Sequence, residues 1–202
     1  MRVIGGTSGG RILKVPKGYD VRPTPGQVKQ ALFNSLGERV VGARILELFG
    51  GSGALSIESI SRGAIGAVCV ELAPRHARMI TANATALGLN PKLFELRMQD
   101  VFVAIPQLLA LGRQFELILA DPPYGEKNVG HRSTSFAQKL LDLESLPRLL
   151  PEGGRFCLGH SKRDTLEIPA YWSEAKVLKH GDSIFRLFEP SRNPPQPCPD
   201  PS

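Results

Sequence analysis

The feature that most constrains the fold of this chain is a regular alternation of short apolar runs and amphipathic segments from residue 44 onward. The apolar runs have the length of strands, and the segments between them carry apolar residues three and four positions apart, as helices do. Strands joined by such helices form a mostly parallel α/β sheet with helices on both faces. The expected strands are residues 43–48, 66–71, 93–98, 115–120 and 154–160, followed by an antiparallel pair at 175–180 and 183–189. The expected helices are residues 53–63, 73–88, 101–112 (interrupted by Pro106) and 136–150.

The N-terminal part of the chain has a different pattern and carries the excess charge. A hairpin is expected around the glycine-rich turn GGTSGGR, followed by a helix that Thr24 caps and Pro25 begins. Residues 1–44 hold eight basic residues and two acidic ones, so their excess of +6 equals the net charge of the whole chain. This clustering favours a polyanion-binding surface over a surface that only keeps the chain soluble. The basic residues are Arg2, Arg11, Lys14, Lys17, Arg22, Lys29, Arg39 and Arg44.

Three segments are therefore predicted. Residues 1–43 form a small basic extension, a hairpin plus a helix, that faces RNA or another polyanion. Residues 44–189 form the main domain, and residues 190–202, with six prolines, form a disordered tail.

Composition excludes several classes of protein. No apolar run reaches the length of a membrane span, and the N-terminus lacks the apolar stretch of a secretory signal. The three cysteines and four histidines show no disulfide or metal-ligand spacing. We therefore expect a cytoplasmic protein with no membrane partner and no metal.

The predicted strand ends carry the candidate binding residues. In open α/β sheets, ligands bind at the carboxyl ends of the strands. Here the first strand ends in the glycine-rich loop ELFGGSG, the second in Glu71 and the third near Asp100. Each has an ordinary explanation: tight packing for the glycines, a helix dipole for Glu71 and a helix cap for Asp100. Together they favour a nucleoside site, which fits either a nicotinamide cofactor or S-adenosylmethionine.

The fourth strand end, Asp121-Pro122-Pro123-Tyr124, is the most specific signal in the chain. Two prolines have no N–H to donate, so the segment offers the Asp121 carboxylate and the Pro122 carbonyl as acceptors beside the Tyr124 ring. That arrangement suits an exocyclic amine on a planar base, which a nicotinamide-dependent oxidoreductase would not need. The alternative is a rigid turn followed by a tyrosine that packs.

With these residues in view, the sequence resembles a known family. The motifs RVIGGTSGGRIL, RPTPGQVKQALFNSL, GGSGALSIESISRGA and DPPY, with the late HSK and GDS, are similar to those of the bacterial RsmD family, over roughly residues 1–189. That family methylates the N2 amine of a guanine in 16S rRNA. The resemblance implies a Rossmann-like class I methyltransferase fold with a seven-stranded sheet, S-adenosylmethionine as cofactor, and the assembled small ribosomal subunit as partner. A monomer is expected.

The resemblance also assigns roles by position. It implies cofactor contacts at Glu47, Phe49, Gly51, Ser52 and Gly53, with Glu71 at the ribose and Asp100 and Val101 at the adenine. It implies catalytic positioning by Asp121, Pro122, Pro123 and Tyr124, and RNA contacts at Arg11, Lys17, Arg22 and Thr24. The chain departs from the family pattern at Gly26, Gln27, Glu47, Gly50, Gly159 and His180.

Three other functions fit parts of the sequence. A DNA adenine or cytosine amino-methyltransferase would use the same DPPY motif, but it ordinarily needs a separate target-recognition region. A nicotinamide-dependent oxidoreductase fits the glycine loop and Glu71. A non-catalytic RNA-binding assembly factor fits the basic segment.

Overall fold

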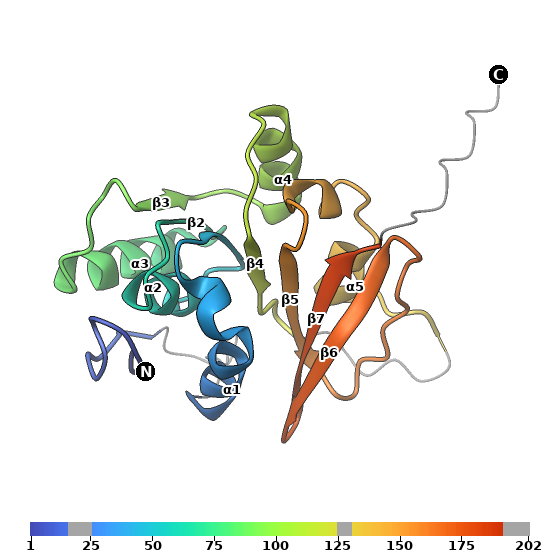
Figure 1. The fold of residues 1–202 in the computed structure, drawn as a ribbon, viewed down its shortest axis with the longest axis horizontal. Coiled ribbons are helices and arrows are strands. Elements are labelled where there is room, and N and C mark those ends of the chain that lie inside the picture. The colour runs from blue at the N-terminus through green and yellow to red at the C-terminus, as the bar shows by residue number, and fades with distance from the viewer. Residues whose placement is uncertain (16–25, 125–130, 192–202) are drawn as a thin grey trace.

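A computed structural model describes residues 1–15, 26–124 and 131–191, and its centre is a seven-stranded sheet. The strand order is β3-β2-β1-β4-β5-β7-β6; the first five strands are parallel, and β7 runs antiparallel to both of its neighbours. Figure 1 shows β3 at one edge of the sheet and the β6–β7 pair at the other. The strands are β1 Arg44–Leu48, β2 Gly66–Val70, β3 Phe94–Arg97, β4 Leu117–Ala120, β5 Arg155–Ser161, β6 Trp172–His180 and β7 Ser183–Pro190. The predicted mostly parallel sheet is confirmed.

Helices cover both faces of the sheet because successive strand residues are buried on opposite sides. On one face, α1 and α2 pack on strand residues such as Ile45, Leu117 and Phe185. On the other face, α4 and α5 pack on residues such as Leu48 and Ala120. The α-helices are α1 Gly26–Leu36, α2 Ala54–Ser61, α3 Pro74–Ala86, α4 Val101–Ala110 and α5 Phe136–Leu141, and the 3-10 turns are η1 Gly37–Val40 and η2 Pro147–Leu149.

Two helix predictions are wrong. The expected helix 136–150 ends at Leu141, and Pro147 stands at the first position of the 3-10 turn η2, where its missing N–H costs no helical hydrogen bond. The expected interruption at Pro106 is absent: α4 runs through this proline, and its buried residues on both sides of it are anchored in the core.

The N-terminal segment lies against α2 through a buried charge cluster. Its expected hairpin is present as a single antiparallel bridge between Arg2 and Ile12. The Glu58 carboxylate in α2 accepts hydrogen bonds from the amides of Ile4 (2.8 Å) and Gly5 (2.9 Å). Lys29 of α1 lies 2.9 Å from Glu58, and both side chains are 0% exposed. Lys29 is therefore held inside the protein and does not face a polyanion, contrary to its place in the basic cluster.

No helix within residues 1–15, 26–124 and 131–191 is long and apolar enough to cross a bilayer. Two of the cysteines, Cys69 and Cys157, are buried and free. Burial raises the pKa of Cys157 to about 12 and that of Cys69 well above its usual value. Both are therefore protonated core residues.

Candidate active site

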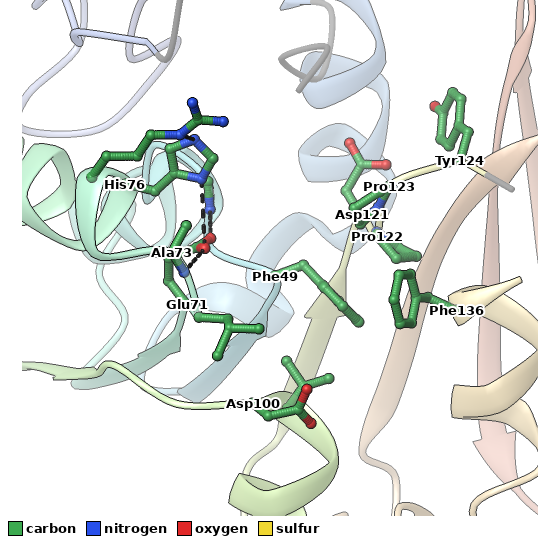
Figure 2. Close-up of a pocket in the computed structure, with 14 residues that line it drawn as sticks. Phe49, Glu71, Ala73, His76, Asp100, Asp121, Pro122, Pro123, Tyr124 and Phe136 are labelled. Atoms are coloured by element: carbon green, nitrogen blue, oxygen red, sulfur yellow. Dashed lines mark hydrogen bonds and ion pairs between the residues drawn. The ribbon is translucent and has the colours of Figure 1, made fainter. Parts of the chain in front are cut away.

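A cavity of about 510 Å³ opens at the carboxyl ends of the central strands. It lies where the strand order reverses, since β2 and β4 flank β1 on opposite sides. This is the position at which open α/β sheets bind their ligands. Figure 2 shows the DPPY segment at one end of the cavity and Glu71 and His76 at the other. The lining residues are Phe49, Gly51, Glu71, Leu72, Ala73, Arg75, His76, Asp100, Val101, Asp121, Pro122, Pro123, Tyr124 and Phe136.

Glu71 joins the glycine-rich loop to the start of α3. Its Oε2 accepts a hydrogen bond from the Gly51 amide at 2.7 Å, and its Oε1 accepts one from the Ala73 amide at 2.7 Å. His76 Nδ1 lies 3.5 Å from the same Oε1 (Figure 2). The carboxylate thus complements the helix start and also lines the cavity, so the two interpretations of Glu71 are compatible.

Asp100 likewise both caps a helix and lines the cavity. Its Oδ1 accepts a hydrogen bond from the Phe102 amide at 2.7 Å and so caps α4. The residue also lines the cavity, next to Val101. A helix cap is locked in place, which makes Asp100 a fixed acceptor at this edge of the cavity.

An aromatic wall stands between the two acidic ends. The ring centroids of Phe49 and Phe136 are 5.4 Å apart, and Phe102 lies 6.5 Å from Phe49. Phe49 has a φ of 60°, a left-handed conformation that costs a non-glycine residue about 1–3 kcal/mol. Figure 2 shows the Phe49 and Phe136 rings facing each other below Asp121. The wall offers a planar ligand an apolar surface.

Glu47 lies behind the cavity rather than along it. It is buried within β1 and accepts hydrogen bonds from the α2 amides of Leu55 (3.2 Å) and Ser56 (2.9 Å). Burial raises its pKa, although the donors at Ser56, Leu55 and Cys69 oppose that shift. Ser52 and Gly53 are also outside the set of described residues that line the cavity. Glu47 thus holds the start of α2 from behind the cavity.

The DPPY segment, Asp121 to Tyr124, directly follows β4. All four residues line the cavity, and Tyr124 is 38% exposed. Its hydroxyl donates a hydrogen bond to Ser183 Oγ at 2.9 Å, at the start of β7. The hydroxyl therefore anchors Tyr124 to the start of β7, while the side chain stays partly exposed.

One of the four predicted RNA contacts falls within the described part of the chain, and it does not line the cavity. Arg11 is exposed on the N-terminal segment, where its guanidinium donates to the Ala86 carbonyl at 2.7 Å. Lys17, Arg22 and Thr24 lie outside the described residues. Within the part of the chain that is described, no three or more His, Cys, Asp or Glu residues are grouped so as to hold a metal ion.

Five lining residues escaped the sequence analysis. Leu72, Ala73, Arg75 and His76 directly follow Glu71, so extending each strand-end motif into the next helix would have found them. Phe136 comes from the start of α5 and carries no signal in its local sequence. Only the folded chain brings it to Phe49.

The sheet order, its antiparallel edge and the position of the cavity define the class: this is the Rossmann-like fold of class I S-adenosylmethionine-dependent methyltransferases. The chain belongs to the family described as conserved hypothetical protein 95, whose model matches residues 1–189.

A curated relative is similar in sequence, and solved structures are similar in fold. Ribosomal RNA small subunit methyltransferase D of Escherichia coli K12 is 29% identical over 190 residues, which span 94% of this chain and 89% of the relative. The structure of a hypothetical protein from Thermus thermophilus has a TM-score of 0.72 and 29% identity, covering 94% and 99% of the two chains. An RNA methyltransferase from Salinibacter ruber, solved with S-adenosyl-L-homocysteine, shares the fold with a TM-score of 0.62 at 20% identity, covering 86% and 97%.

Proposed function

We propose that this chain is an S-adenosylmethionine-dependent rRNA methyltransferase that methylates the exocyclic N2 amine of a guanine in 16S rRNA, within the assembled small ribosomal subunit. The observation that carries the proposal is that Asp121, Pro122 and Tyr124 share one cavity with Glu71 and Asp100. The printed name of the Escherichia coli relative supports rRNA as the substrate class. Such a substrate would place the activity in the cytoplasm, and a monomer would suffice for it.

The cavity suits the cofactor in its chemistry. Glu71 would accept hydrogen bonds from the ribose hydroxyls, and Asp100 would accept them from the adenine amine. Phe49, Val101 and Phe136 would enclose the adenine ring between apolar surfaces. When bound, the cofactor supplies an electrophilic methyl group on a positively charged sulfur.

The DPPY segment would prepare the nucleophile. Guanine N2 is weakly nucleophilic because its lone pair is delocalised into the ring. Hydrogen bonds from its two N–H groups to the Asp121 carboxylate and the Pro122 carbonyl would favour a pyramidal nitrogen and free that lone pair. The Tyr124 ring would stack on the base, a contact worth ~1–3 kcal/mol per base.

Positioning would supply most of the rate enhancement. Holding two reactants in the right orientation lowers the barrier by ~7–11 kcal/mol, whereas a general base raises the rate only by ~10²–10⁴-fold. Attack by the nitrogen on that methyl group would release a neutral thioether and leave the positive charge on the nitrogen. Its acidic proton would then pass to Asp121 or to water.

Replacement of Asp121 tests the proposal. We expect Asp121→Ala to lose methyl transfer into small subunits that lack the modification while it binds S-adenosylmethionine as the wild type does. Nucleoside analysis of the product by mass spectrometry identifies the methylated atom. Wild-type turnover by Asp121→Ala would refute the role of the DPPY segment.

Parallel substrates separate the competing functions. Transfer into duplex DNA would favour a DNA amino-methyltransferase, and rRNA binding without transfer into any substrate would favour an assembly factor. Thermal stabilisation by NAD but not by S-adenosylmethionine would favour an oxidoreductase.

RNA engagement by the N-terminal segment remains a proposal. Deleting residues 1–22 would be a poor test, because Asn83 hydrogen-bonds both to Lys14 and to the Ser52 carbonyl of the glycine-rich loop. Point substitutions to Gln at Arg11, Lys17 and Arg22 avoid that disturbance. If about four phosphates are neutralised, the log–log salt dependence of RNA affinity should have a slope near −3. We expect each substitution to reduce the slope and leave cofactor affinity unchanged.

A further inference from the structure

Gly159 lies where a side chain would collide with the Asp121 carboxylate. A Cβ at Gly159 would stand 2.4 Å from Asp121 Oδ1, 3.1 Å from Asp121 Cγ and 2.9 Å from Phe185 Cζ. Real Cβ atoms essentially never approach another heavy atom within 3.0 Å. The carboxylate therefore occupies the space of the side chain that Gly159 lacks.

Strand register brings these residues together. Ala120, the last residue of β4, is paired with Leu158 of β5, so Asp121 follows beside Gly159. Gly159 is in turn paired with Phe185 of β7, whose ring closes the other side of the space. Asp121 Oδ1 is buried there. The backbone of β5 and the Phe185 ring thus form a seat for the carboxylate.

We propose that Gly159 is a positioning residue: its missing side chain fixes the orientation in which Asp121 meets the base amine. This inference rests on the proposed function, because it concerns the same carboxylate. Gly159 itself touches neither substrate nor cofactor. It acts only by leaving room for Asp121.

The contact predicts a loss of activity without a comparable loss of stability. In Gly159→Ala the carboxylate turns away, and the buried Phe185 ring must also shift by a few tenths of an ångström, so a modest loss of stability accompanies the loss of activity. A displacement of about 1 Å in a reacting geometry costs ~10²-fold in rate. We expect kcat for methyl transfer to fall by about that factor, with cofactor affinity unchanged. Gly66→Ala, in β2, is the matched control, because a Cβ at Gly66 would have only the Leu93 carbonyl oxygen nearby, at 4.0 Å.

A double substitution separates positioning from a purely structural role. If Gly159 acts through Asp121, removing the carboxylate should remove most of the effect of Gly159→Ala on stability. Thermal unfolding should show that Gly159→Ala is less harmful in an Asp121→Ala background, because the colliding carboxylate is gone. If Gly159→Ala alone does not fold, the double variant should fold.

Two results would overturn the inference. These are wild-type turnover by Gly159→Ala, or a double variant that is no more stable than the sum of its parts. They are distinct from failure of the proposed function, which requires Asp121→Ala to remain active or the wild-type chain to transfer no methyl group to rRNA.

Discussion

The substitution Gly50→Ala should expose a packing constraint beneath the glycine-rich loop. Gly50 is buried, and a Cβ there would stand 2.4 Å from Cys69 Sγ and 3.1 Å from Ile80 Cδ1. Its φ is not positive, so the backbone itself accepts alanine. The Cys69 thiol is therefore the main obstacle to alanine, and the contact with Ile80 is a lesser one.

The expected cost follows from how firmly the thiol is held. Ordinary contact begins near 3.4 Å, so Sγ or the loop must move by about 1 Å. Cys69 is 0% exposed within β2, and its thiol donates a hydrogen bond to Glu47 Oε2 at 3.4 Å. Overpacking of this kind destabilises a protein by ~1–3 kcal/mol. For a domain of this size, that lowers Tm by ~2–4 °C per kcal/mol.

A second substitution should remove that cost. Cys69→Ala deletes one buried heavy atom, a loss of ~0.5–1.5 kcal/mol by itself, and provides the room that the added methyl group of Gly50→Ala needs. The double variant should therefore be more stable than the sum of the two single effects by ~1–3 kcal/mol. Cys157→Ala is the matched control, since this other buried cysteine is not among the atoms near Gly50.

Urea unfolding of the wild type, both single variants and the double variant measures this coupling. Additivity within ~0.5 kcal/mol for the Gly50–Cys69 pair would refute the packing argument. So would equal coupling between Gly50 and Cys157. S-adenosylmethionine affinity of the same variants shows whether the loop shifts with its support.

Three further predictions concern the N-terminal segment and the DPPY segment. Lys29→Met removes the lysine from the buried Glu58 carboxylate but leaves Arg62 paired with it at 2.7 Å, so urea unfolding should show a loss smaller than the ~3–5 kcal/mol of a fully unpaired buried charge. Burial opposes ionisation of Glu58, but hydrogen bonds and charge from the Ile4 amide, Lys29 and Arg62 outweigh burial and lower the pKa of Glu58. The stability that this shift contributes is present above the unfolded pKa of about 4.3 and is lost as pH falls through the folded pKa. The free energy of unfolding measured against pH should therefore fall less steeply in acid for Glu58→Gln than for the wild type. Tyr124→Phe keeps the ring but removes the hydrogen bond to Ser183, so kcat for methyl transfer should fall less than in Tyr124→Ala; equal losses would contradict a stacking role.

The sequence predicted the parts of the fold that depend on local pattern. Each central strand is buried on both faces, so it appears as an unbroken apolar run, and the helices between strands carry one apolar face. Local pattern did not show that α4 continues through Pro106, because that depends on how the helix packs on the sheet. It also counted Lys29 as a surface charge, because a sum of charges contains no information on burial.

The candidate site was predictable where residues directly follow strands. Glu71 and Asp121 stand immediately after β2 and β4, and parallel strands deliver such residues to one edge. Glu47 stands two residues before Phe49, the residue that follows β1 as Glu71 and Asp121 follow β2 and β4. It is paired with Cys69 inside the sheet, so its carboxylate meets α2 instead of the cavity. Phe136 and the contact between Gly159 and Asp121 depend on long-range register, which no local motif records.

That register explains why the cavity has a polar side and an aromatic side. Leu48 of β1 is paired with Val70 of β2 and with Ala120 of β4, and all three belong to the core under α4 and α5. The residues after them, Phe49, Glu71 and Asp121, form one row across the sheet edge. Because side chains alternate along the strands, those of Glu71 and Asp121 point to the opposite face from Val70 and Ala120. On that face, Glu71 accepts a hydrogen bond from the Gly51 amide, and Phe185 flanks Asp121.

Phe49 is the exception in this row, and its backbone conformation is the cause. With φ at 60°, Phe49 does not follow the alternation, and its ring packs with Phe102 and Phe136 on the α4 and α5 side. Figure 2 shows the Glu71 and Asp121 carboxylates at opposite ends of the cavity, with the Phe49 ring between them. The ~1–3 kcal/mol of strain at this residue thus places an apolar wall between two acceptors. The proposed reaction would use all three, the wall for a planar base and the two acceptors for the cofactor ribose and the target amine.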